Sequence, residues 1–209
     1  HVDLEAGFQN ILDHNIVSFP KALWYMSRFT NYMPEESGSF MLVITMPLGG
    51  ITGGTQTILA FNYGAGQPDR VKKAQRFIFL LSAGYTTILF ILAQTAGHIF
   101  VRLFTSDPAL IAEAAKTIKI YTLAVIPLSI QYVIVDGFTG LGKVQLSLPL
   151  SFFRKLVYFL PLFLLPRFFG ARATFYAEPI SDIIAPVVSI FVYAVAMKRI
   201  LKKPVIPNF

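Results

Sequence analysis

The segment 134–145 contains the residues of this chain that most resemble a known chemical motif. Gly137 is followed after four residues by Gly142 and Lys143, a spacing close to that of the glycine-rich loop that binds nucleotide phosphates. That loop needs Ser or Thr directly after the lysine to hold Mg²⁺, and this chain has Val144 there. Because a true phosphate loop lies between a buried strand and a helix, the surrounding segments decide whether the motif is real.

The same segment contains Asp136, a carboxylate within a long apolar stretch. An ionisable group at membrane depth is costly, so its default interpretation is the binding of a cation or a proton. Two alternatives are that Asp136 lies in a wet cytoplasmic funnel, or that it forms a structural ion pair with Arg154. We favour an ion pair for Arg154, and we expect its neighbour Lys155 to extend to the membrane interface.

Two acidic residues, Glu178 and Asp182, are four apart and therefore share one face of a helix. Because they are close to the outer end of the last apolar segment, we interpret them as an interfacial polar cluster or a helix N-terminal charge pair rather than a cation site. A role in substrate binding is the alternative.

Neutral polar residues also occur at membrane depth, namely Gln56, Gln131 and Tyr132. They are candidates for lining a substrate cavity through hydrogen bonds and cation–ring attraction. The commoner use of such side chains is to hold helices together. Gly50 and Gly54, also four apart, predict a close helix contact, with flexibility of that helix as the alternative.

The composition indicates a membrane protein. Of the 209 residues, 55% are hydrophobic and 14% are charged, and the mean hydropathy is +0.60. Cysteine is absent and the three histidines are scattered, so we expect no metal site, no cofactor and no enzyme activity. The net charge of +7 does not indicate a nucleic-acid partner, because the basic residues cluster at the ends of apolar segments.

Five apolar segments predict an all-α polytopic membrane helix bundle whose immediate partner is the lipid bilayer. Each is long enough to cross a hydrocarbon core of about 30 Å. The third continues a helix that starts at Ser106 or Asp107 with Pro108, and Pro127 is expected to kink this helix rather than end it. The segments are 39–62, 77–101, 120–142, 144–166 and 176–197.

The rest of the chain is assigned from its composition and charge. Residues 1–37 are expected to form an irregular or interfacial segment, 38–203 a helix bundle and 204–209 a cytoplasmic tail. The chain begins with His1 and has no signal-peptide pattern, so we expect a fragment or processed piece. Lys and Arg are more frequent in the tail and in the connections after the first and third spans, which places these segments in the cytoplasm.

Residues 56–77 resemble the multidrug and toxic compound extrusion (MATE) transporter family. In that family the eighth of twelve helices ends in a Gln, a few apolar residues and Asn-Tyr-Gly-Ala before a basic connection. Residues 138–148 resemble the approach to the eleventh helix, and 151–170 and 177–185 resemble the last two helices, so the resemblance covers about 38–203. The matching motif residues are Gln56, Asn62, Tyr63, Gly64, Ala65, Arg70 and Lys73.

The resemblance implies helices eight to twelve of a C-terminal lobe. Family members export small organic cations by alternating access, driven by Na⁺ or H⁺, with the substrate held between two lobes. We therefore expect a secondary antiporter of organic cations or drugs in a bacterial plasma membrane. It would be completed by a missing N-terminal lobe or a second copy, and Asp136 would couple the cation or proton.

Two alternatives stay open. One is a non-transporting truncated remnant, or a modulator of a full-length transporter, which the missing lobe favours. The other is a flippase of lipid-linked precursors from the same superfamily, which would need a more strongly cationic cavity than Arg154 alone provides. In either case Lys143 marks the cytoplasmic end of a kinked membrane helix, and the phosphate-loop interpretation is rejected.

Overall fold

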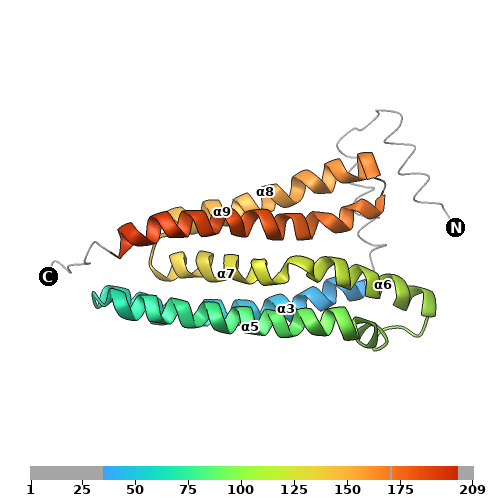
Figure 1. Cartoon of the computed structure of the whole chain (residues 1–209), viewed down its shortest axis with the longest axis horizontal. Coiled ribbons are helices and arrows are strands. Elements are labelled where there is room, and N and C mark those ends of the chain that lie inside the picture. The colour runs from blue at the N-terminus through green and yellow to red at the C-terminus, as the bar shows by residue number, and fades with distance from the viewer. Residues whose placement is uncertain (1–34, 170, 202–209) are drawn as a thin grey trace.

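The computed structural model describes residues 35–169 and 171–201, which form a bundle of long helices (Figure 1). No strand occurs in these two ranges, and the predicted all-α membrane class is confirmed. Two short 3-10 helices, η1 and η2, link α6 to α7 and α8 to α9. The elements are α3 (Glu35–Gly54), α4 (Gln56–Gly64), α5 (Pro68–Val101), α6 (Pro108–Tyr121), η1 (Thr122–Ala124), α7 (Val125–Gly140), α8 (Val144–Phe169), η2 (Ala171–Tyr176) and α9 (Ala177–Ile200).

Helix α7 is the centre of the bundle. It packs against α3, α4, α5, α8 and α9, and in Figure 1 it lies between the α8–α9 pair and the α3–α5 pair. Its apolar side chains enter all three core clusters, through Leu128, Val133 and Phe138. Asp136 therefore lies on the helix with the most neighbours.

Four helices among the described residues are long and apolar enough to cross a membrane. They correspond to the second, third, fourth and fifth predicted spans. The second of the four combines α6, η1 and α7, and it contains Pro127. The helices are Pro68–Val101, Pro108–Gly140, Val144–Leu165 and Ala173–Ile200.

The first predicted span, 39–62, is wrong as a single helix, because it is divided at Thr55 between α3 and α4. Glycine has low helix propensity, and Gly53 and Gly54 are the last two residues of α3. The Thr55 hydroxyl donates to the main-chain oxygens of Ile51 at 3.0 Å and Thr52 at 2.8 Å, bonds that compete with the helix ladder. The described ranges therefore contain four helices of spanning length and composition, and not five.

Within the described ranges the close helix contact predicted at Gly50 and Gly54 is also absent, since a Cβ atom at either position would meet none of their heavy atoms within 4 Å. The close approach lies at Gly140 of α7 instead. A Cβ atom there would lie 2.9 Å from the main-chain oxygen of Gln56. Gly140 thus allows the backbone of α4 to touch α7.

Pro127 does not end its helix, as predicted. Because proline has no N–H, the main-chain oxygen of Leu123 loses its helical donor, and the 3-10 helix η1 occurs at this point. Gln94 of α5 adds a donor from outside the helix: its Nε2 atom lies 3.1 Å from the main-chain oxygen of Lys119 and 3.1 Å from the hydroxyl of Thr122. A neighbouring helix thus satisfies polar groups beside the irregular turn.

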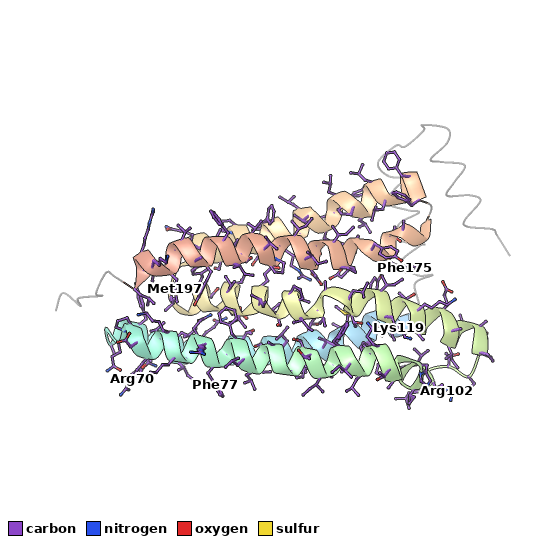
Figure 2. The ribbon with its side chains drawn as sticks, viewed as in Figure 1. Arg70, Phe77, Arg102, Lys119, Phe175 and Met197 are labelled. Atoms are coloured by element: carbon purple, nitrogen blue, oxygen red, sulfur yellow. The ribbon has the colours of Figure 1, made fainter. Side chains whose placement is uncertain are left out.

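The basic connections lie together at one end of the bundle. The α4–α5 connection, the α7–α8 connection and the C-terminal end of α9 share this end in Figure 1. Figure 2 shows Arg70 and Met197 there and Arg102 at the opposite end. If these three basic segments all face the cytoplasm, they must lie at the same end of the bundle, and they do. Their location in the cytoplasm stays a prediction.

Replacing Gly140 with alanine should destabilise the bundle, because the new methyl group would meet the backbone of Gln56. Overpacking of this kind costs about 1–3 kcal/mol. The matched control is Gly84→Ala on α5, where nothing lies within 4 Å and alanine favours the helix by about 1 kcal/mol. Thermal unfolding of both variants in one detergent measures the difference, and equal midpoints would contradict the close approach of α4 and α7.

Candidate functional site

Asp136 joins three helices through its two carboxylate oxygens. The hydroxyl of Thr52 on α3 donates to Oδ2 at 2.5 Å, and the amide Nε2 of Gln56 on α4 donates to Oδ1 at 3.1 Å. Thr52 and Gln56 stand on either side of the break at Thr55. One half-buried carboxylate of α7 therefore holds the end of α3 and the start of α4.

The local sequence explains this convergence. Gly140 lies one turn after Asp136 on the same face of α7, and its missing side chain admits the Gln56 backbone. Thr52 was not predicted as a site residue, although it precedes Gln56 by four residues in a charge-free segment. That spacing is the signal that would have identified it, because polar residues four apart lie on one helical face.

Asp136 has no charged partner among the described side chains. The nitrogen atoms of the described Lys, Arg and His residues all lie more than 4 Å from its carboxylate. Its two hydrogen-bond donors are neutral, so an ionised Asp136 keeps its full negative charge. The predicted ion pair between Asp136 and Arg154 is therefore wrong.

Arg154 of α8 instead binds two carboxylates of α9, and we call Arg154, Glu178 and Asp182 the α8–α9 triad. Its Nε and Nη2 atoms lie 3.0 Å and 2.9 Å from Oδ1 of Asp182, and Nη2 lies 3.1 Å from Oε1 of Glu178. Asp182 is buried inside the bundle, with an exposed fraction of 0%, and the interfacial interpretation of the two carboxylates stays a prediction. The four-residue spacing reveals that the two carboxylates share a face, but it does not reveal that this face turns toward α8.

The other two predicted cavity residues do not hydrogen-bond Asp136. Gln131 is buried, and its Nε2 atom donates to the main-chain oxygen of Leu150 on α8 at 3.4 Å. The ring of Tyr132 lies under the Arg154 guanidinium, 6.0 Å from ring centroid to Cζ. Gln131 thus links two helices, and Tyr132 lies beside the triad, one helical turn before Asp136.

The family motif forms the turn between α4 and α5. The amide of Asn62 donates to the main-chain oxygen of Ile58 at 2.8 Å, and the Lys143 ammonium lies 5.6 Å from the centroid of the Tyr63 ring. The first contact lies within α4, and the second links the end of α4 to the α7–α8 connection. The motif residues at this turn are Asn62, Tyr63, Gly64, Ala65 and Arg70.

Gln75 is a buried polar residue that sequence reasoning missed, because it lies among the basic residues of a predicted surface connection. It is 1% exposed, and its Nε2 atom donates to the main-chain oxygen of Val133 at 3.0 Å. A Cβ atom on Gly137 would lie 2.7 Å from that same nitrogen. The available signal was its position between Val71 and Ile78, on the buried face of α5.

The Asp136 site offers oxygen atoms of three kinds: a carboxylate, the Thr52 hydroxyl and the Gln56 amide. Such atoms bind a proton or a hard cation, and the amide would have to rotate to present its oxygen. In the part of the chain that the structure describes, no group of three or more His, Cys, Asp or Glu side chains could hold a metal ion. A single carboxylate with neutral neighbours suits a ligand of one positive charge.

Comparison with known proteins identifies one family. Residues 37–165 match the sequence model of the MatE family. No curated protein matches the chain.

Two solved structures have a similar fold. One is described as the inward-facing conformation of a multidrug resistance MATE family transporter of the MOP superfamily, with a TM-score of 0.73, 14% identity, and coverage of 80% of this chain and 39% of that one. The other is the Vibrio cholerae MATE transporter VcmN in its bent form, with a TM-score of 0.70, 18% identity, and coverage of 94% and 43%. The chain therefore spans less than half the length of these transporters.

Replacing Arg154 with methionine should strongly destabilise the bundle, because Glu178 and Asp182 would lose their shared cation. Breaking a buried ion pair by removing one partner costs about 3–5 kcal/mol. Lys155→Met is the matched control, since Lys155 is exposed and its loss should change stability by less than about 0.5 kcal/mol. Unfolding in one detergent compares the two variants, and an equal loss in both would contradict the structural role of the triad.

Proposed function

Because the chain belongs to the MatE family and is an integral membrane helix bundle, we propose that it forms one lobe of a secondary active antiporter that exports small organic cations. Na⁺ or H⁺ would drive export through Asp136. The observation that carries the proposal is the Asp136 carboxylate itself, which has neutral donors from Thr52 and Gln56 and no cationic partner among the described side chains.

The coupling step follows from the charge of Asp136. An ionised carboxylate within an apolar bundle is costly, so a proton or a Na⁺ ion at Asp136 lowers that cost. Either ligand changes the hydrogen bonds of Asp136 with Thr52 and Gln56. Since these two residues flank the break at Thr55, ligand binding shifts the balance between two arrangements of α3 and α4.

The charges of the bundle favour a cationic substrate over an anionic lipid-linked one. The flippase alternative needs a cationic cavity, and Arg154 was the candidate to provide it. Glu178 and Asp182 neutralise Arg154, and Asp136 adds a further negative charge. The described interior thus attracts cations, and Tyr132 offers an aromatic ring for an organic cation.

We further propose that export requires a second helix bundle, supplied either by a further length of chain or by a second copy. Transporters of this general design hold their substrate between two bundles that rock against each other. The coverage of 39% and 43% of the solved transporters supports this requirement. The proposed location is a bacterial plasma membrane, with the basic end of the bundle in the cytoplasm.

Vesicles that contain this chain together with the N-terminal lobe of a MatE family transporter should export ethidium when a Na⁺ or pH gradient is imposed. Vesicles that contain this chain alone should not, because one bundle cannot enclose the substrate. Fluorescence of vesicle-trapped ethidium measures the rate, and applying each gradient separately distinguishes Na⁺ from H⁺. If neither gradient drives efflux when both lobes are present, transport is refuted and the non-transporting alternative is favoured.

In the same vesicles, Asp136→Asn should abolish gradient-driven efflux, because an amide neither takes up a proton nor carries the charge that attracts Na⁺. Thr52→Val should reduce activity about 10- to 100-fold, as loss of a group that orients a ligand typically does. The matched control is Asp69→Asn, which changes an exposed carboxylate at the start of α5 and should leave efflux unchanged. Normal efflux by Asp136→Asn would remove Asp136 from the coupling site.

A further inference from the structure

The α8–α9 triad carries more negative charge than positive. Arg154 contributes one positive charge, and Glu178 and Asp182 contribute two negative charges when both are ionised. The side chain of Asp182 is 0% exposed, and those of Arg154 and Glu178 are 16% and 29% exposed. The triad therefore has a net formal charge of −1, with one of its two carboxylates removed from solvent.

The hydrogen bonds of Asp182 are unevenly distributed between its two oxygens. Both Arg154 nitrogens that bind it donate to Oδ1. The Oδ2 atom is buried and has no hydrogen-bond partner among the described residues. The Oγ atom of Ser181 carries one proton and lies 2.9 Å from the main-chain oxygen of Glu178 and 3.4 Å from Oδ1 of Asp182, so the main-chain oxygen is the better acceptor.

The neighbouring elements add no second positive charge among the described side chains. The titratable groups that interact electrostatically with the triad are Tyr132 of α7, Tyr158 of α8 and Tyr121 of α6. Pro186, one turn after Asp182, supplies no N–H to the main-chain oxygen of Asp182. The region around Asp182 thus contains more acceptor oxygens than donors.

We propose that the α8–α9 triad takes up one proton, which binds to Oδ2 of Asp182. This site is separate from Asp136, which lies on α7 and binds Thr52 and Gln56. Proton uptake brings the net charge of the triad to zero. It does not depend on the proposed transport activity, because the excess charge exists in this chain by itself.

A proton fits this site better than a metal ion does. A metal ion needs several oxygen ligands around it, whereas a proton needs one lone pair and no cavity. The free Oδ2 atom of fully buried Asp182 offers that lone pair. The groups that could compete for the proton are Glu178, which is partly exposed, and the three tyrosines, whose phenols are already protonated at neutral pH.

Protonation changes the contact between α8 and α9. With Asp182 ionised, Arg154 binds two carboxylates of α9; with Asp182 neutral, Glu178 is its remaining charged partner. A hydrogen bond between an ion and a neutral group is weaker than one between two ions of opposite charge. The attraction between these two helices therefore decreases as the pH falls.

The test is an infrared pH titration of the whole chain in lipid nanodiscs, following the carbonyl stretch of protonated carboxyl groups. The difference between the wild-type protein and Asp182→Asn should contain one carboxyl band. Glu178→Gln should move that band to lower pH, with proton affinity reduced about 10-fold or more, because Arg154 then pairs with Asp182 alone and favours its ionised form. Glu113→Gln, the same change at a half-buried glutamate of α6, should leave the band in place.

Three outcomes would overturn the proposal. The first is a wild-type spectrum identical to that of Asp182→Asn, and the second is a band that Glu178→Gln does not move. The third is a band that disappears when Na⁺ is added at constant pH, which would assign a metal cation to the triad. If Asp182→Asn does not fold, the band positions of Glu178→Gln and Glu113→Gln still test the proposal, since both variants keep Asp182.

Discussion

Polar and charged groups inside an apolar bundle must find their partners on neighbouring helices, and this constraint determines how the helices of this chain face one another. Asp136 takes its donors from α3 and α4, and Arg154 takes its acceptors from α9. Buried Gln75 and Gln131 donate to main-chain oxygens of the helices opposite. Because an apolar side chain is equally stable against lipid or protein, these polar contacts fix the rotation of each helix about its axis.

The two carboxylate sites differ in how their charge is balanced. Asp136 lies among neutral donors, whereas Asp182 shares a cation with a second carboxylate. Tyr132 lies between them: it is one turn from Asp136 on α7, and its ring faces Arg154. A change of charge at either site alters the electrostatic potential at this ring, so Tyr132 is sensitive to both sites.

Local sequence signals predicted most of the helices. The segment 77–101 has no charged residue and is a continuous helix, and the main-chain N–H of Ala109 donates to Asp107 at the expected start of α6. Hydropathy did not reveal the break at Thr55, because hydropathy does not measure helix propensity. The glycine and threonine content of that region is the relevant signal, and flexibility of this helix is the alternative interpretation of Gly50 and Gly54 that fits the break.

The partners of the polar residues could not be predicted in the same way. Whether Arg154 forms its ion pair with Asp136 or with Asp182 depends on the rotation of α8 relative to its neighbours. That rotation is a property of the packed bundle. Spacing along one helix identifies residues that share a face, such as Glu178 and Asp182, but not the helix that this face meets. Similarly, Gly140 is distinguished from Gly54 only by the helix that approaches it.

The short connections at the basic end of the bundle restrict how the helices can move. Three residues join α4 to α5 and three join α7 to α8, and each link contains a glycine of positive φ, Gly66 at 65° and Gly142 at 69°. Three residues span at most about 10 Å, so these helix ends cannot separate. A change in the angle between α4 and α5, or between α7 and α8, would therefore move the far ends of these helices more than the ends at the connection.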